Sequence, residues 1–108
     1  MDRMKALMRA ALVALPLAAL CGAASAAEYE IVIDKMKFGV APVDLKVGDV
    51  IVWRNDDMFR HTATARDKSF DVDLPPKKSA RMTMEQAGAI DYFCRFHPGM
   101  VGKLEVRP

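Results

Sequence analysis

The sequence predicts an all-β fold, a Greek-key β-sandwich of about seven or eight short strands. Several segments alternate apolar and polar side chains, which is the pattern of a strand with one buried face. Glycine, proline and aspartate residues interrupt these segments at short intervals and favour turns. No segment of the domain repeats its apolar side chains with the period of an amphipathic helix. Short strands with closely spaced turns are typical of sandwiches with Greek-key connections.

The first half of the domain contains the earliest predicted strands. Residues 28–33 are rich in β-branched side chains, and residues 35–38 continue with apolar side chains alternating with lysine. After a break at glycine and proline, residues 43–47 alternate again and predict a second half-buried strand. A Gly-Asp pair then favours a tight turn before residues 50–53, a strong strand whose Trp53 is expected to fill the core.

The second half of the domain repeats this pattern. A polar segment follows Trp53, and residues 55–60 are expected to form a loop. Two prolines at 75–76 must end the strand before them, because proline cannot donate to a sheet ladder. The strands predicted beyond the loop are residues 61–64, 70–74, 79–84, 89–93 and 103–106.

Residues 1–26 predict a cleaved secretory signal peptide. Basic side chains near the start precede an apolar stretch that ends at Leu20, and residues 24–26 (Ala-Ser-Ala) form a small-residue cleavage signal. The apolar stretch is too short for a permanent transmembrane helix. A lipoprotein anchor at Cys21 is the weaker alternative, because Leu20 stands where lipoprotein signals place a small residue.

Cleavage after Ala26 leaves residues 27–108, which form one small domain without net charge. The whole chain contains 16 Lys and Arg residues and 14 Asp and Glu residues. The charged residues of the leader are Arg3, Lys5, Arg9 and Asp2. The remaining domain therefore has equal numbers of basic and acidic side chains. Nucleic acid is not an expected partner, because nucleic-acid-binding domains present a basic face.

Cys94 is the single cysteine of the domain that remains after cleavage. No intramolecular disulfide is then possible, although export delivers the domain to an oxidising compartment. A free thiol is vulnerable to oxidation there unless it is buried or occupied. A buried core cysteine is one interpretation, because free cysteine packs like a small hydrophobic residue. Metal ligation is the other, and the residues around Cys94 favour it.

Three potential metal ligands follow one another at a spacing of three residues: Cys94, His97 and Met100. The Pro-Gly pair before Met100 predicts a turn that folds the segment around one point. His61 is the one other histidine of the chain, at the start of a predicted strand. Taken alone, each side chain has an ordinary structural explanation. Together, a thiolate, two imidazoles and a thioether are the ligand set of type 1 copper sites.

A wider set of residues forms the pattern of a known family. It comprises Lys35-Met36-Lys37-Phe38, residues 45–49 (Leu-Lys-Val-Gly-Asp), Val52-Trp53, Asn55, Met58, His61, residues 85–88 (Glu-Gln-Ala-Gly), Asp91-Tyr92 and Cys94-x-x-His97-Pro98-x-Met100-x-Gly102-Lys103. On these residues the chain resembles the cupredoxins. Among them it is most similar to amicyanin, with pseudoazurin and plastocyanin more distant. The likeness covers most of the domain that follows the leader.

The resemblance implies a function and a set of ligands. It implies one type 1 copper ion held by His61, Cys94, His97 and Met100, and single-electron transfer by Cu(I)/Cu(II) cycling in the periplasm. The implied partners are redox proteins such as a periplasmic dehydrogenase or a c-type cytochrome. Separately, we expect a monomer without a membrane anchor. Thr62 departs from the family pattern, which has an asparagine there that ties the two ligand loops together.

Two other functions have less support from the sequence than electron transfer. Copper storage or delivery is the alternative function, although the methionines of residues 79–84 alternate like core residues. Catalysis is not expected, because both histidines are already used and no second metal cluster is visible. Beside His97, an apolar docking patch is expected from Pro98, Gly99 and Met100 together with Met58 and Phe59. Arg95 is expected on the loop surface, and Phe96, where amicyanin-like loops usually have proline, is expected to pack.

Overall fold

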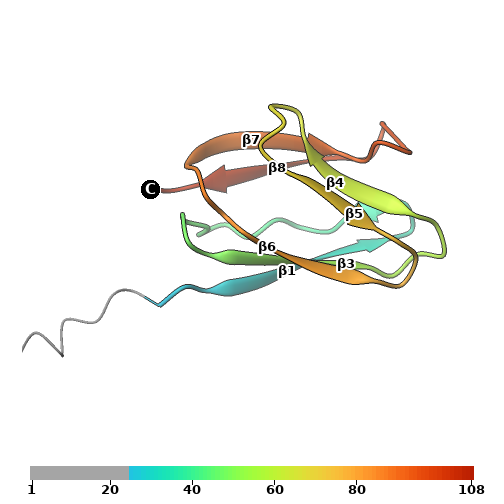
Figure 1. Cartoon of the computed structure of the whole chain (residues 1–108), viewed down its shortest axis with the longest axis horizontal. Coiled ribbons are helices and arrows are strands. Elements are labelled where there is room, and N and C mark those ends of the chain that lie inside the picture. Colours follow the sequence, from blue (N-terminus) through green and yellow to red (C-terminus); the bar gives the residue numbers. More distant parts are fainter. Residues whose placement is uncertain (1–24) are drawn as a thin grey trace, which may run out of the picture.

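The computed structural model describes residues 25–108, so that the predicted signal peptide falls almost entirely outside the described residues. The described residues form two four-stranded sheets that pack as two layers (Figure 1). The strands of the first sheet are β1 (Glu28–Asp34), β2 (Lys37–Phe38), β3 (Val50–Asn55) and β6 (Ser79–Thr83). Those of the second are β4 (His61–Ala65), β5 (Asp71–Leu74), β7 (Gly88–Phe93) and β8 (Val101–Val106).

The predicted fold class, an all-β Greek-key sandwich, is confirmed. The strand order is β2-β1-β3-β6 in the first sheet and β5-β4-β7-β8 in the second. The chain crosses between the sheets after β3, β5 and β6. All strand pairs are antiparallel except β1 with β3, which run parallel. Within the described residues, no helix is long and apolar enough to cross a membrane.

Aromatic side chains fill the core between the sheets. Trp53 is fully buried, as expected, and the Tyr92 ring packs against it with 5.1 Å between ring centroids. Phe38 packs edge-on against Tyr92 at 4.8 Å. Gly102, the strand neighbour of Tyr92, makes room for this ring, because a Cβ atom there would lie 2.3 Å from the ring. Burial of the hydroxyl raises the pKa of Tyr92 to about 12.

The alternating pattern of residues 35–38 does not form a strand throughout, and this part of the prediction was wrong. Only Lys37–Phe38 pairs with β1, because Lys35 and Met36 make a tight turn with φ of 52° and 62°. Left-handed backbone is unfavourable for residues with a side chain. It is stabilised here by Asp57, whose carboxylate accepts hydrogen bonds from the amides of Lys35 and Met36 at 2.8 and 3.0 Å. A long-range contact therefore overrides the local pattern.

The second half-buried strand predicted at residues 43–47 was also wrong. Of its apolar side chains only Leu45 is buried, whereas Val43 is 88% exposed and Val47 is 40% exposed. The backbone makes a single parallel bridge, in which Arg107 pairs with Lys46. The segment is an irregular connection that is anchored to the core by Leu45. The alternation of apolar and polar residues alone could not show that it lacks a strand partner.

Asp49 is a buried carboxylate just before β3. Its Oδ1 accepts hydrogen bonds from the Ala27 amide at 2.9 Å and from Lys46 Nζ at 3.0 Å. Its Oδ2 accepts one from the Lys46 amide at 2.9 Å. These hydrogen bonds, led by that of Ala27, hold the pKa of Asp49 below its usual value although burial acts in the opposite direction. Asp49 therefore fastens the start of β1 to the start of β3.

We expect Asp49→Asn to lower the stability of the domain at neutral pH. A carboxyl whose pKa falls on folding stabilises the protein above its unfolded pKa of about 3.9, and this contribution is lost as the pH falls through the folded pKa. Urea unfolding of the metal-free wild type and variant should therefore show a stability difference that shrinks below about pH 4. A difference that stays constant down to about pH 3 would contradict the assigned role.

Candidate metal centre

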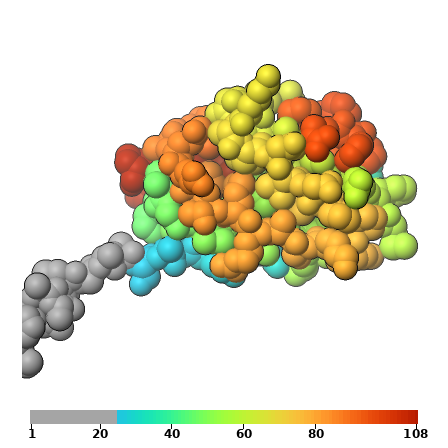
Figure 2. All heavy atoms as spheres, viewed as in Figure 1, coloured from blue at the N-terminus to red at the C-terminus, as the bar shows by residue number. Residues whose placement is uncertain are grey.

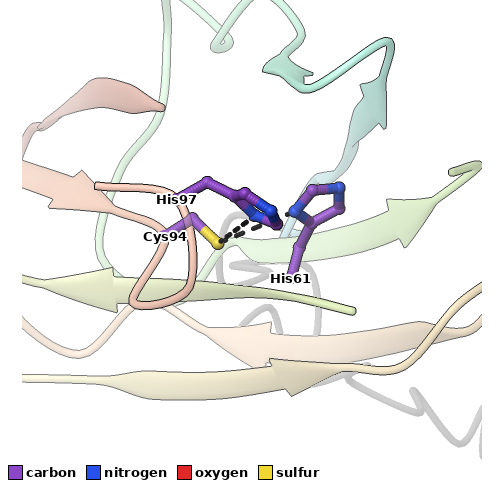
Figure 3. Close-up of side chains that lie close together, drawn as sticks. All are labelled: His61, Cys94 and His97. Carbon is purple, nitrogen blue, oxygen red and sulfur yellow. Dashed lines mark hydrogen bonds between the residues drawn. The ribbon is translucent and has the colours of Figure 1, made fainter. Parts of the chain in front are cut away.

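The side chains of His61, Cys94 and His97 meet at one end of the sandwich (Figure 3). His61 is the first residue of β4, a central strand of the second sheet. All five residues of β4 are buried. Cys94 follows the last residue of β7, and His97 lies on the loop between β7 and β8. Because β4 and β7 are neighbours in the sheet, the two segments lie side by side.

The donor atoms of these residues are close enough to share one ion. Cys94 Sγ lies 3.6 Å from His61 Nδ1 and 3.8 Å from His97 Nδ1. The three potential ligand atoms all lie within 4.8 Å of one another. Nitrogen and sulfur donors bind d-block ions at about 2.0–2.3 Å, so that donors on one ion are about 3.5–4 Å apart. The two sulfur–nitrogen distances match this separation.

Backbone hydrogen bonds fold residues 94–100, the ligand loop, into consecutive turns. The Met100 amide donates to the His97 carbonyl at 2.8 Å, and the His97 amide donates to the Cys94 carbonyl at 3.3 Å. The Cys94 amide donates to the Met100 carbonyl at 3.1 Å and closes the loop. Met100 is buried at the loop end. The loop therefore holds both sulfur-containing side chains, those of Cys94 and Met100, in buried positions at this end of the sandwich. The role of Met100 as a ligand stays a prediction.

A carboxylate orients His61. His61 Nε2 donates a hydrogen bond to Asp57 Oδ2 at 2.8 Å, which leaves Nδ1 as the nitrogen that faces Cys94. Burial raises the pKa of Asp57, but the hydrogen bonds from the Met36 amide, His61 and the Lys35 amide outweigh it, so that this pKa lies below its usual value. A charged acceptor behind a ligand histidine fixes its tautomer and strengthens the ligand.

The role of Asp57 was not predicted, because the residue was expected only to lie in a loop. Its one signal is its position four residues before His61 in a polar segment, and such spacing is too common to identify a partner. Asn55 supports it, because its Oδ1 accepts the Asp57 amide at 2.8 Å while its Nδ2 donates to carbonyls of the neighbouring segments.

We expect Asp57→Asn to weaken copper binding by about 10- to 100-fold, the usual effect of losing a histidine's carboxylate partner. The physical reason is that a neutral amide no longer holds the Nε2 proton as firmly, so that the imidazole is a weaker and less well-oriented donor. Titration against a chelator measures the affinity. Asp56→Asn is the matched control, because Asp56 is a neighbouring aspartate that pairs with Arg54 and does not contact His61. Equal affinities for all three proteins would exclude this role.

His97 differs from His61 in its exposure to solvent. It is only partly buried, and Phe59 packs edge-on beside its ring with 6.4 Å between centroids. Phe96 was expected to pack, but its side chain is 49% exposed and lies beside the Arg95 guanidinium instead. Phe96 is exposed because the loop turns its neighbours Cys94 and His97 inward. We call Met58, Phe59, Phe96 and the exposed Pro98 and Gly99 the apolar patch.

The chemistry of the donor set fits copper. A thiolate and two imidazoles are soft or borderline donors, whereas magnesium and calcium require oxygen ligands. Cys94 is fully buried, but two imidazole nitrogens face its sulfur, which distinguishes it from a cysteine packed among apolar side chains. The Thr62 amide donates to the same sulfur at 3.4 Å. Hydrogen bonding and burial of this kind are features that tune type 1 copper sites.

Comparisons with known proteins agree with this geometry. A family model described as cupredoxin-like domain matches residues 6–106. The chain is 32% identical to amicyanin of Paracoccus versutus over 80 residues, which cover 68% of this chain and 61% of that protein. It is 33% identical to amicyanin of Paracoccus denitrificans over 92 residues, which cover 78% and 70%. The match to the first relative thus spans less than two thirds of that relative's length.

Solved structures show the same fold. The structure of amicyanin from Paracoccus versutus superimposes with a TM-score of 0.62 at 28% identity, covering 82% of this chain and 88% of that one. A purple cupredoxin from Nitrosopumilus maritimus gives a TM-score of 0.60 at 25% identity, covering 72% and 98%.

Proposed function

The chain belongs to the cupredoxin-like family, and from this premise we propose that it is an exported electron carrier with one type 1 copper ion. The observation that carries the proposal is the convergence of two imidazole nitrogens on the buried sulfur of Cys94, all within 4.8 Å. Copper bound there supplies a one-electron change between Cu(I) and Cu(II).

The proposed ligands have separate tasks. Cys94, His61 and His97 would hold the ion as strong donors, and Met100 would be a weaker fourth ligand. Asp57 orients His61 by accepting a hydrogen bond from its Nε2, and the Thr62 amide donates a hydrogen bond to the sulfur of Cys94. These supports come from the second sheet and its adjoining turns. A site whose ligands are fixed in advance changes little when the electron arrives, and this favours rapid transfer.

The proposed role is not that of an enzyme. Four protein ligands leave little room for a substrate at the ion, and the chain has no histidines beyond the two assigned here. Storage or delivery of copper is the alternative. It has little support from the methionines of β6 and the turn after it, because Met82 packs against the core and Met84 is buried.

The proposal places the protein in the periplasm as a monomer without a membrane anchor. Residues 1–26 have the features of a secretory leader, and residues 27–108 are the proposed domain. A single buried cysteine without a disulfide partner in this domain is compatible with an oxidising compartment when a metal occupies it.

The apolar patch is the proposed docking surface for redox partners such as a periplasmic dehydrogenase or a c-type cytochrome. It surrounds His97, the most exposed of the proposed metal-binding side chains, and Met58 and Phe59 are 73% and 59% exposed. Figure 2 shows that the 56–60 segment (light green) and the ligand loop (orange-red) lie at the same end of the molecule. A small apolar surface suits the weak, transient encounters of electron transfer.

We expect Met58→Lys to slow electron self-exchange between reduced and oxidised copies by about tenfold, because two patches that meet would then oppose like charges. The rate is measured from NMR line broadening in mixtures of the two oxidation states. Val43→Lys is the control, because Val43 is also strongly exposed but lies near the C-terminal end of β8, whereas the ligand loop precedes the first residue of β8. Equal slowing by both substitutions would show that net charge, rather than docking through the patch, sets the rate.

The central test of the proposed function is copper loading of the mature domain. Cu(II) should give one equivalent of tight binding with an intense blue colour, and a mild reductant should bleach the colour reversibly without loss of copper. Reversible voltammetry of the same sample should give a stable midpoint potential. Tight binding without the blue band, or loss of the ion on reduction, would favour storage or delivery instead.

A further inference from the structure

Thr62 occupies the position between the two segments that supply the proposed ligands. It follows His61 on β4, and both its amide and its hydroxyl reach the start of the ligand loop. The Arg95 amide donates to Thr62 Oγ1 at 2.9 Å, while the Thr62 amide donates to Cys94 Sγ at 3.4 Å. Thr62 is fully buried, and its hydrogen bond to the sulfur is shielded from water, whereas the one from the Arg95 amide is partly buried.

The hydroxyl of Thr62 belongs to a longer chain of hydrogen bonds. Thr62 Oγ1 lies 2.8 Å from Thr64 Oγ1, and Thr64 Oγ1 donates to Asp71 Oδ1 at 2.7 Å. Each hydroxyl has one proton to donate, and that of Thr64 is committed to the carboxylate. Thr62 must therefore donate to Thr64 while it accepts from Arg95. The direction of each hydrogen bond in this series, from Arg95 through the two threonines to Asp71, is therefore fixed.

Arg95 closes the chain into a circuit. Its Nε donates to Asp71 Oδ1 at 3.1 Å, the same oxygen that accepts from Thr64. Asp71 is held in place by β5, where it is the register partner of Thr64. The Thr64 hydroxyl, and after it Arg95, hold the pKa of Asp71 below its usual value against the opposing effect of partial desolvation. The acceptor, whose side chain is 54% exposed, is therefore charged. Charged acceptors make the stronger hydrogen bonds.

We propose that this circuit of Thr62, Thr64, Asp71 and Arg95 is a positioning device for Cys94. It takes the place of the asparagine that the family pattern has after the first histidine. The proposal rests on the proposed copper site, because its effect is exerted on a copper-bound sulfur. The circuit connects the ligand loop to β4, the strand of His61, through side-chain hydrogen bonds. It thereby preserves the hydrogen bond from the Thr62 amide to the sulfur of Cys94.

The circuit should raise the reduction potential. An N–H group that donates to a thiolate withdraws electron density from the sulfur, which weakens its donation to Cu(II) more than to Cu(I). If the loop separates from β4, this N–H contact lengthens and the sulfur donates more strongly. The oxidised state is then favoured, and the potential falls.

The first experiment is amide hydrogen exchange on Thr62→Val, which keeps the shape of threonine and removes the hydroxyl. We expect the Arg95 amide to exchange about tenfold faster than in the wild type, because its acceptor is gone. Thr83→Val is the matched control, because Thr83 is an exposed threonine of the other sheet. Unchanged protection of Arg95 in Thr62→Val would overturn the proposal.

The second experiment is voltammetry of the copper-loaded variants. Thr62→Val should lower the midpoint potential, and Thr62→Ser, which restores the hydroxyl, should return it towards the wild-type value. A purely structural role would change the melting temperature and leave the potential in place. If the wild type is blue and reversible but all three proteins share one potential, the circuit has no positioning role and the proposed function still holds. A wild type that lacks the blue site refutes the proposed function itself.

A second, independent feature concerns the start of the domain. The Ala27 amide donates to the buried Asp49 carboxylate at 2.9 Å, and the Ala27 carbonyl accepts the Val50 amide at 2.9 Å. The predicted cleavage site lies directly before this residue, and Ala26 is exposed. Hydrolysis of the Ala26–Ala27 bond would leave a carboxylate on Ala26 and a new amino group on Ala27, which is protonated at neutral pH.

We propose that removal of the leader converts this amide hydrogen bond into an ammonium–carboxylate pair that fastens β1. The pair would share Asp49 with the Lys46 ammonium, which lies 3.0 Å from the same oxygen. This proposal rests on cleavage after Ala26 and is independent of copper. Processing would then itself stabilise the exported domain.

The test compares two forms of the mature domain, one with a free Ala27 amine and one with this amine acetylated. The free form should melt about 4 °C higher or more, as expected when one charged pair is gained in a domain of this size. The same comparison in Asp49→Asn controls for effects of acetylation elsewhere. Equal melting of the two wild-type forms, or a difference that persists in Asp49→Asn, would overturn the proposal. An exported protein whose first residue is not Ala27 would do the same.

Discussion

Copper added to the Cys94→Ser variant should produce no intense blue colour. The colour of a type 1 site arises from the covalent bond between Cu(II) and a thiolate, and a serine hydroxyl is a harder donor that stays protonated at neutral pH. The sulfur also lies at the centre of the site, 3.6 and 3.8 Å from the imidazole nitrogens of His61 and His97. Its removal therefore takes away the strongest donor and the spectroscopic signature together.

The absorption spectrum of the copper-loaded variant is the measurement, with far-UV circular dichroism to show that the sandwich is intact. Serine differs from cysteine by one atom and has a hydrogen-bond donor nearby in the Thr62 amide, so the fold should persist. His61→Gln provides a comparison, because it removes one imidazole and keeps the thiolate. It should weaken and shift the visible band without abolishing it. An intense band in Cys94→Ser would show that the assignment of the sulfur ligand is wrong.

The parts of the fold that sequence analysis predicted well are those in which local pattern and tertiary environment agree. The strand at residues 50–53 has β-branched side chains on both faces of a central strand, and it became β3. The segment 43–47 has an equally regular alternation but lies outside both sheets. Alternation reports which side chains would share a face, and it does not report whether a partner strand is available.

The candidate site shows the same division. His61, Cys94 and His97 were singled out because their chemistry is rare and their spacing is characteristic, and the structure brings them together. Asp57 was not identified, and Thr62 was noted only as a departure from the family pattern, because aspartate and threonine are common residues. Their roles depend on contacts with residues up to 32 or 33 positions away, such as the contact of Thr62 with Cys94 and Arg95. The reactive groups can be identified from the sequence, whereas the groups that position them can be identified only once the fold is known.

The exposed loop residues add a physical reason for one wrong expectation. Phe96 is a large apolar side chain, and burial is its usual state. In the ligand loop, however, Cys94 and His97 turn inward to the site, and the two residues between them face solvent. Phe96 is left on the surface, where it extends the apolar patch.

Replacement of Met100 should move the reduction potential in opposite directions for two different side chains. The axial ligand tunes the potential of type 1 sites. Met100→Gln offers a harder carbonyl oxygen that stabilises Cu(II), so the potential should fall by on the order of 100 mV, which corresponds to about a fiftyfold change in relative affinity for the two oxidation states. Met100→Leu removes the ligand and leaves an apolar wall, so the potential should rise. Both proteins should stay blue, because Cys94, His61 and His97 remain.

Voltammetry of the two variants distinguishes a ligand from a packing residue. Met100 is buried, and a side chain that only packs would show a loss of stability for glutamine and little change of potential for leucine. Met84→Leu is the matched control, because Met84 is a buried methionine that packs in the core outside the ligand loop. Its potential should equal that of the wild type. If Met100→Gln and Met100→Leu share the wild-type potential as well, Met100 is not the axial ligand, and the fourth donor must be sought elsewhere at this end of the sandwich.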